Sequence, residues 1–359
     1  MGIKNEDFKK IIELMPIGWE EKAKELKAIE RSRKIKNAEE LLRMILLYLT
    51  NGESFGKTSS MLRLTDQNSL NKNAVYERIV KSRDWLKWLC ENISRNAGEL
   101  VKKPEWLKDK KVCLIDASDV SKKGSNGSDY KLHYNVELFN LEMREMHITE
   151  SSVGEKFQNF KKLGTDDIVI ADRAYGSLKS INYLKEKNCG FILRLKAGAF
   201  NFYDSEGIKI ELSDCFEELK EGESSDKILF YKEKEKLLSI RVCGMRKSKE
   251  MEQKGLKQIK HSNTRHMRGK VSKKQAIYNK YILLATSCDR EIKSEYIVEL
   301  YRMRWEIELV FKRIKSIFSY GEMPSKLEKT AESWFYGKLL LSYICESLVN
   351  KGRFSPREK

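Results

Sequence analysis

The sequence predicts an α/β protein: a mixed sheet flanked by helices, with an all-helical domain before it and a β-rich insertion within it. Three observations support this prediction. Residues 1–105 show helical periodicity without the strand alternation that begins at residue 112. From there to residue 195, short apolar runs alternate with helical segments. Residues 198–292 then carry a second series of strand-like runs before helical periodicity returns.

The elements between residues 112 and 195 follow the order β-β-β-α-β-α-β. Strands are expected at 112–115, 130–138, 144–149, 167–171 and 190–195, and helices at 154–163 and 177–186. The first and fourth strands are continuous apolar runs, which is typical of buried central strands. Asp116 and Asp172 close these two runs, where an α/β sheet places its working groups. Taken alone, each aspartate is equally well explained as a turn residue or a helix cap.

A helix expected at residues 301–315 has one face for packing and one for chemistry. At about 100° per residue, five side chains fall within roughly a quarter-turn of one another: Tyr301, Arg304, Glu308, Lys312 and Lys315. An apolar stripe that includes Met303 and Ile307 lies on the opposite side and is expected to be buried. Glu308 has the i, i+4 spacing of ordinary surface salt bridges to its basic neighbours. The two strand-end aspartates favour the chemical interpretation over this one, because they supply partner carboxylates.

These residues together resemble the signature of bacterial DDE transposases of the insertion-sequence 4 family. The resemblance rests on Asp116 in LIDASDV, Asp172 in IADRAYG, and Tyr301, Arg304, Glu308 and Lys315 at spacings of three, four and seven. The segments GSDYKLHYNVELF (127–139) and FILRLK (191–196) also resemble that family. The similarity covers about residues 110–345. It implies a ribonuclease H-like catalytic core, whose strand and helix order is the one predicted above.

The resemblance implies a metal site and a DNA-binding surface. Asp116, Asp172 and Glu308 are the implied catalytic residues and ligands of two Mg²⁺ ions, about 4 Å apart, for which Mn²⁺ substitutes. Asp119 is the alternative to Asp116, although it lies outside the apolar run. The implied DNA-binding residues are Tyr301, Arg304, Lys312, Lys315, Arg194 and Arg173, with Tyr301 contacting a phosphate or steering the terminal strand.

The implied reaction is cut-and-paste transposition without a covalent protein intermediate. Water nicks one strand at each transposon end, and the freed 3′-hydroxyl forms a hairpin that a second water opens before strand transfer. The partners are double-stranded DNA and a second copy of the chain, paired as a homodimer in the DNA complex. Related enzymes stack a flipped base on an aromatic residue, often tryptophan. Because this chain has no tryptophan between Trp106 and Trp305, Tyr278, Tyr281 or Trp305 is expected to substitute.

Composition agrees with a polyanion-binding protein. Seventy Lys and Arg residues against 53 Asp and Glu give a net charge of +17, as in nucleic-acid-binding proteins generally. The seven cysteines show no CxxC pairing, so neither a zinc site nor a disulfide framework is predicted. No apolar run approaches the roughly 18 residues of a membrane span. The expected location is the bacterial cytoplasm, in association with the nucleoid.

The chain is expected to consist of three parts with different functions. Residues 1–105 are predicted to form a helical DNA-binding domain with a candidate helix-turn-helix at 54–86, for which a plain helical bundle is the alternative. Residues 106–197 and 293–350 form the catalytic core. Residues 198–292 form the β-rich insertion, with strands at 208–212, 227–231, 237–242 and 278–285. A basic loop at 246–274, with 11 Lys or Arg against two Glu, is expected to lie along DNA rather than to be a merely solvated loop.

Two other functions compete with a transposase. One is a DNA-binding regulator derived from a transposase that has lost catalysis, which the presence of all three acids disfavours. The other is a ribonuclease H-like nuclease that cleaves without joining. The insertion and the set formed by Tyr301, Arg304 and Lys315 disfavour this second reading, because they suit the holding of transposon ends.

Overall fold

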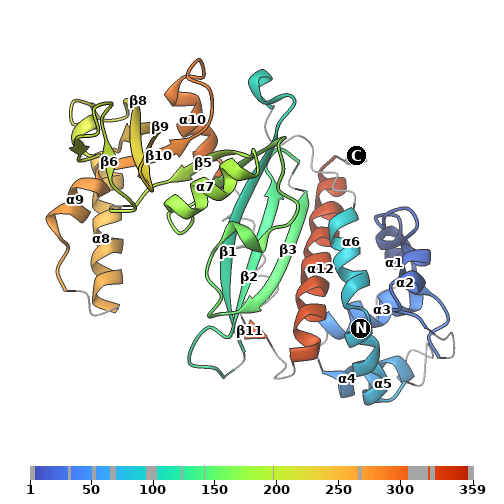
Figure 1. Ribbon diagram of the computed structural model, residues 1–359. Coiled ribbons are helices and arrows are strands. Elements are labelled where there is room, and N and C mark those ends of the chain that lie inside the picture. Colours follow the sequence, from blue (N-terminus) through green and yellow to red (C-terminus); the bar gives the residue numbers. More distant parts are fainter. Residues whose placement is uncertain are drawn as a thin grey trace, which may run out of the picture.

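The computed structural model describes residues 5–30, 34–50, 54–64, 70–93, 103–122, 124–140, 142–196, 198–265, 269–305, 322–323 and 328–354. Within these ranges the predicted fold class is confirmed, because a large mixed sheet is flanked by helices and the N-terminal region is helical (Figure 1). None of the helices in these ranges is long and apolar enough to cross a membrane.

The N-terminal helices form a bundle that the last helix of the chain completes. The bundle contains α1 (Asn5–Ile12), α2 (Trp19–Glu25), α3 (Ala38–Thr50), α4 (Phe55–Leu64), α5 (Lys72–Lys81), α6 (Arg83–Asn92) and α12 (Glu328–Phe354). Figure 1 shows α12 between the sheet and the N-terminal helices. Gly337 lets α12 approach α3 closely, because a Cβ there would meet Leu49 at 2.7 Å. The two ends of the sequence therefore share one hydrophobic core.

The strands form one continuous sheet with the order β3-β2-β1-β4-β5-β10-β9-β8-β6-β7, and β11 pairs with β1 outside this path. The strands of the core are β1 (Lys111–Lys122), β2 (Tyr130–Glu137), β3 (Met143–Glu150), β4 (Asp167–Ala171), β5 (Gly190–Arg194) and β11 (Glu322–Met323). The insertion contributes β6 (Phe202–Tyr203), β7 (Lys209–Ile210), β8 (Ser224–Glu233), β9 (Lys236–Arg246) and β10 (Tyr281–Thr286). β1, β4 and β5 are parallel neighbours.

Both faces of the central strands are covered, which explains their uninterrupted apolar sequences. Val112 and Leu114 of β1 point into the core shared with the bundle. Cys113 and Ile115 point into a second core, which helix α7 (Leu178–Glu186) covers. The helix predicted at 177–186 is therefore present, and the Ser177 hydroxyl caps it by accepting the Ser180 amide.

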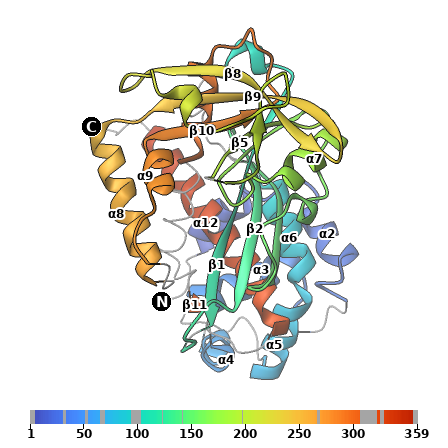
Figure 2. The ribbon, with the colours of Figure 1, turned by 60° about the vertical axis from the view of Figure 1, so that its left-hand side comes forward.

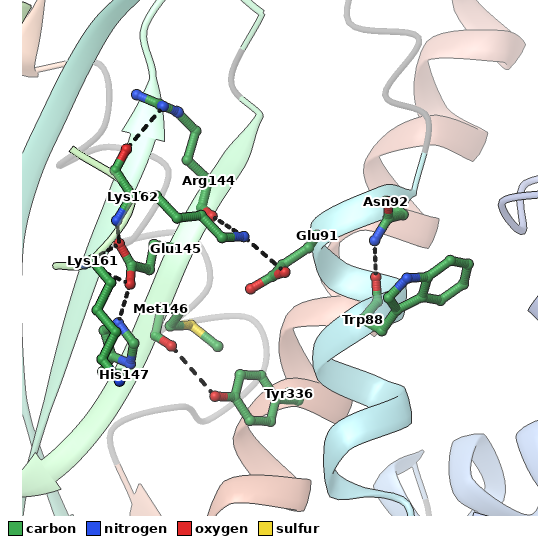
Figure 3. A network of polar contacts seen from close by, with 10 residues as sticks. All are labelled: Trp88, Glu91, Asn92, Arg144, Glu145, Met146, His147, Lys161, Lys162 and Tyr336. Carbon is green, nitrogen blue, oxygen red and sulfur yellow. Dashed lines mark hydrogen bonds and ion pairs between the residues drawn. The ribbon is translucent and has the colours of Figure 1, made fainter. Parts of the chain in front are cut away.

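The helix predicted at 154–163 is wrong. This segment is irregular apart from the 3₁₀ turn η2 (Phe157–Asn159). The backbone amides of Lys161 and Lys162 donate to the buried carboxylate of Glu145 on β3 instead of to helix carbonyls. Figure 3 shows this contact beside the ion pair between Lys162 and Glu91 of α6. A tertiary carboxylate thus replaces the local hydrogen bonds that the periodicity predicted.

The insertion differs from its prediction in three places, the first of which is the short strand β6, which was not predicted. The basic stretch contains a helix, α8 (Lys249–Arg265), rather than a loop alone. The strand predicted at 278–285 begins only at Tyr281, because residues before it form helix α9 (Lys273–Asn279). Ser272 and Gln275 form a capping box that fixes the start of α9. The insertion also contains the 3₁₀ turn η3 (Asp214–Phe216). After β10 the chain leaves the insertion and forms helix α10 (Ser294–Arg302).

The bundle is fastened to the sheet through β3 (Figure 3). The Tyr336 hydroxyl of α12 donates to the Met146 carbonyl at 3.4 Å. Lys162 donates to the Arg144 carbonyl and pairs with Glu91, both at 3.1 Å. The short 3₁₀ turn η1 (Glu105–Leu107) leads from the described end of the bundle into β1. These contacts make the helical part and the sheet a single packed body.

We expect Gly176→Ala to lower the free energy of unfolding by about 1–3 kcal/mol. Gly176 follows β4, and a Cβ there would overlap the backbone carbonyl of Arg194, which has no side-chain freedom with which to move away. Gly164→Ala is the matched control, because nothing lies within 4 Å of its added Cβ. Chemical denaturation followed by circular dichroism measures both variants, and equal stabilities would contradict this reading of the β4–α7 turn.

Candidate active site

The two strand aspartates lie side by side in the sheet. β1 and β4 pair in parallel from Lys111 opposite Asp167 to Ile115 opposite Ala171. Asp116 and Asp172 are the next residues on the two strands. β4 ends at this point, whereas β1 continues. The two carboxylates therefore lie at the edge where β1 no longer has β4 as its neighbour.

One detail of the prediction is wrong: Asp116 does not close its strand. β1 continues to Lys122, because β2 pairs with it as far as Val120 opposite Tyr130. Asp116 is therefore held by a strand neighbour on one side and is open on the side that β4 has left. This makes its position more rigid than that of a residue in a loop.

Basic and hydroxyl groups from distant parts of the chain surround the aspartates. The Tyr301 hydroxyl donates to Asp172 Oδ1 at 3.0 Å, and Arg194 Nη1 lies 3.6 Å from the same oxygen. Arg304 Nη1 lies 3.4 Å from Asp116 Oδ2. The Ala117 amide donates to Asp116 Oδ1 at 2.8 Å. The structure thus brings together Asp116, Asp172, Tyr301, Arg194 and Arg304, which lie up to 188 positions apart in the sequence.

Tyr301 and Arg304 belong to different helical segments, which meet at Met303. The predicted helix does not begin at Tyr301, because Tyr301 belongs to the last turn of α10, which starts at Ser294. Met303 forms the cap of α10, and helical geometry resumes at Arg304. Glu308, Lys312 and Lys315 lie outside the described residues. In the part of the chain that the structure describes, no three His, Cys, Asp or Glu side chains form a metal-binding group.

The environment shifts the pKa values of the two aspartates in opposite directions. Burial raises the pKa of Asp116 to about 6, although the Ala117 amide and Arg304 act against it. Burial also disfavours the charged form of Asp172, but Arg304 and Arg194 outweigh it and lower its pKa. Neighbouring acids with pKa values pushed apart are typical of sites that handle charge. A half-buried pair of carboxylates is also a hard oxygen donor set that a divalent cation would stabilise.

Arg173 occupies the turn after Asp172 and lines a cavity. The cavity has a volume of about 370 Å³, and Arg173 lines it together with Lys196, Tyr278, Tyr281 and others from α8, α9 and β10. Burial and the nearby Arg194 lower the pKa of Arg173. Among the described residues, no carboxylate lies within ion-pair distance of its guanidinium. The turn therefore presents one guanidinium to the cavity next to the aspartates.

Sequence reasoning missed two charged neighbours of the site. Glu155 acts on the Asp116 carboxyl and raises its pKa, and it pairs with Lys131 at 3.5 Å. It was hidden because its segment was predicted to be a regular helix. Lys247, in the basic stretch, is buried and donates to the Asn279 carbonyl at 2.7 Å. Asp119 is 60% exposed and lies 3.9 Å from Lys131, three residues along the strand from Asp116 and hence toward the opposite face.

A mixed sheet that sets two acids at neighbouring strand ends, with cations around them, is the framework of the ribonuclease H-like enzymes that act on phosphodiesters. Residues 107–345 match the family model described as "Transposase DDE domain". The chain belongs to this family. It is a DDE transposase, and hence an enzyme of the polynucleotidyl transferase and endonuclease type that depends on divalent metal.

Relatives across most of the chain carry the same description. The putative transposase InsL of insertion sequence element IS186A from Escherichia coli K12 is 24% identical, over 92% of this chain and 90% of its own length. The transposase of IS421 from Escherichia coli is also 24% identical, with the same coverage. The transposase of IS231C from Bacillus thuringiensis subsp. berliner is 26% identical, over 95% of this chain and 78% of its own length. These findings confirm the predicted transposase family.

We expect the stability of the protein to rise with pH above neutrality because of Lys247. Burial, with Arg194 and Arg173 nearby, lowers its pKa to about 8 from the ordinary 10.5. Between these values the folded protein binds fewer protons than the unfolded chain, so the free energy of unfolding increases with pH. From pH 7 to 9.5 we expect a gain of about 2 kcal/mol in wild type relative to Lys247→Met. Denaturant titrations at both pH values measure the free energy of unfolding of wild type and variant. If both proteins show the same change with pH, the lowered pKa of Lys247 is contradicted.

Proposed function

We propose that the protein is a cut-and-paste transposase of an insertion sequence. It binds the transposon ends, nicks them, forms and opens hairpins, and transfers the ends into target DNA. The observation that supports this proposal best is the juxtaposition of Asp116 and Asp172 at neighbouring strand ends, with Tyr301 and Arg304 against them, in a chain of the DDE transposase family. Widely separated segments of the chain thus converge on one site.

The proposed metal ligands are Asp116, Asp172 and Glu308, for two Mg²⁺ ions or for Mn²⁺ in their place. The residues present fit such ions, because Asp116 and Asp172 are hard oxygen donors whose mutual repulsion a cation would relieve. When bound, divalent ions stabilise charge on the attacking and leaving oxygens and activate water. The protein's own contribution is to hold Asp116 on a strand and Asp172 directly after one.

The proposed DNA-binding residues around the site are Arg194, Arg173, Arg304, Lys312 and Lys315, each through the phosphate backbone. Arg173 follows β4 and Arg304 follows α10, so a DNA strand at the site would be held by two separate segments of the protein. The Tyr301 hydroxyl is already used by Asp172. We therefore assign Tyr301 the orientation of that carboxylate, in addition to the phosphate contact expected from the resemblance.

The cavity beside Asp172 supports the hairpin step. A sharply folded DNA end must release an unpaired nucleotide, which aromatic side chains hold by stacking. Tyr278 and Tyr281 line the cavity, and Arg173 and Lys196 add positive charge there. Trp305 is 59% exposed and follows Arg304 directly. We propose the cavity, rather than Trp305, as the place of the unpaired nucleotide because it combines aromatic and basic side chains in one concave site.

The helix α8 is the proposed contact of the insertion with DNA. Its exposed cations Lys249, Lys254, Lys257, Lys260 and Arg265 occupy one side of a helix about 25 Å long. The opposite side packs on α9, where Gly255 allows Asn279 to approach and donate to the Glu252 carbonyl at 2.8 Å. Figure 2 shows α8 extending away from the insertion strands. Such a one-sided basic helix suits a duplex backbone.

We also propose the division of labour expected from the sequence. Residues 1–105 bind DNA, with α4 and α5 as the helix-turn-helix within residues 54–86. Residues 106–197 and 293–350 carry catalysis, and residues 198–292 clamp the DNA. The Asn71 side chain caps α5 by accepting the Ala74 amide, as a recognition helix with a defined start requires. A homodimer would bring two transposon ends together, in the cytoplasm beside the nucleoid.

We expect Asp116→Ala, Asp172→Ala and Glu308→Ala each to reduce cleavage of labelled transposon-end DNA in Mg²⁺ by at least about 10³-fold. Each variant removes one proposed ligand and should retain DNA binding. The assay resolves nicked, hairpin and joined products on denaturing gels. Asp119→Ala is the matched control, since it removes an acid from the same strand, and it should cut like wild type.

The same assay separates the competing functions. Cleavage without joined products would favour a nuclease, and tight DNA binding without any cleavage would favour a regulator. If Asp119→Ala loses cleavage while Asp116→Ala retains it, Asp119 and not Asp116 is the first metal ligand. Cleavage at the wild-type rate in all three alanine variants would contradict the proposed triad.

We expect the triple variant K254A, K257A and K260A to bind end DNA about 10- to 100-fold more weakly at 0.1 M salt. The slope of log affinity against log salt should fall by about 2 to 3, because each lysine neutralises about one phosphate. Fluorescence anisotropy across a salt series measures both quantities. The triple variant K161A, K179A and K187A removes equal charge from exposed sites before, within and directly after α7, outside residues 1–105 and 198–292. Equal losses in the two triples would indicate general electrostatics instead of a contact by α8.

A further inference from the structure

Two arginine side chains contact the same carboxylates that we propose as ligands of divalent ions. Arg304 lies 3.4 Å from Asp116 Oδ2 and Arg194 lies 3.6 Å from Asp172 Oδ1. The side chains of these arginines are only 10% and 19% exposed, respectively. Tyr301 donates to the same oxygen of Asp172. Each aspartate therefore already has a cationic partner.

The charge of the described site works against cation entry. Asp116 and Asp172 contribute −2, and Arg173, Arg194 and Arg304 contribute +3. Their charged neighbours Glu155 and Lys247 cancel each other, so the balance of the described groups is +1. In a partly buried site such charges interact strongly, because solvent screens them less than at the surface. Each DNA phosphate brings −1. Two phosphates would thus change the balance from +1 to −1.

The two contacts are weak enough to be exchanged. A charge-assisted hydrogen bond between nitrogen and a carboxylate oxygen is about 2.7–2.9 Å long, and both site contacts are longer. Arg241, elsewhere in the sheet, lies closer to its aspartate than either of these arginines does. It holds both oxygens of Asp226 at 3.1–3.2 Å and also donates to the carbonyls of Asp289 and Ile292. Arg194 and Arg304 instead make single-nitrogen contacts with their aspartates.

We propose that Arg194 and Arg304 change partners when DNA binds. They hold Asp172 and Asp116 in the free protein, then pass to the phosphate backbone and release the carboxylates to divalent ions. The inference rests on the proposed metal ligands and DNA contacts. DNA and metal binding are consequently coupled, and by linkage each strengthens the other to the same extent. The site is loaded with ions mainly when substrate is present, which limits unproductive hydrolysis.

The test is direct binding of Mn²⁺ to the full chain, measured by electron paramagnetic resonance of the free ion with and without end DNA. For wild type we expect the dissociation constant of Mn²⁺ to fall about tenfold when DNA is added. Arg194→Gln and Arg304→Gln should each bind Mn²⁺ several-fold more tightly than wild type without DNA, and DNA should tighten their binding less. Arg194→Gln, with the more exposed side chain, carries the test if Arg304→Gln does not fold.

Two sets of controls separate this inference from the proposed function. Arg302→Gln removes the same charge from α10 at a side chain that contacts Met245 Sδ, and it should match wild type. Asp116→Asn and Asp172→Asn should lose Mn²⁺ binding with or without DNA. If they bind Mn²⁺ like wild type, the proposed ligands are wrong. If they lose binding while both arginine variants match wild type without DNA, the ligands stand and the exchange of partners is overturned.

Discussion

The parallel pairing of β1 with β4 is the constraint on which the site depends. Its register sets Ile115 opposite Ala171, so that Asp116 and Asp172 emerge together at the end of the shared ladder. Antiparallel pairing with β2 holds Asp116 beyond that point. Both strands are buried on both faces, and the packing of two cores therefore fixes the spacing of the carboxylates. A shift of one residue in this register would turn one acid to the wrong face.

Charge compensation is the second constraint, and it comes from outside the sheet strands that carry the acids. Arg194 arrives at the end of β5, and Tyr301 and Arg304 arrive from the segment after the insertion. Burial without these groups would leave two carboxylates close together at high cost. Because the insertion strands continue the same sheet through β10, α10 starts beside the core and delivers Tyr301 to Asp172. The insertion is thus part of the architecture that completes the site.

The acids were predictable because their signal is local. An apolar run that ends in aspartate is visible in the sequence, and so is the spacing of Tyr301 and Arg304. Glu155 had no such signal, because it lies in the irregular segment before η2 and is positioned by a contact with Lys131 of a distant strand. Lys247 looked like one cation among many in a basic stretch. Its burial against Asn279 depends on how α9 packs.

The sequence by itself determined the fold class, the order of the core strands and the two strand aspartates, because hydrophobic periodicity and strand length are properties of neighbouring residues. Only the tertiary structure decided that β1 runs past Asp116, that residues 154–163 are irregular and that the basic stretch contains α8. It also decided that Arg194 and Arg304 face the aspartates. These features depend on partners far away in the chain, and local periodicity carries no information about such partners.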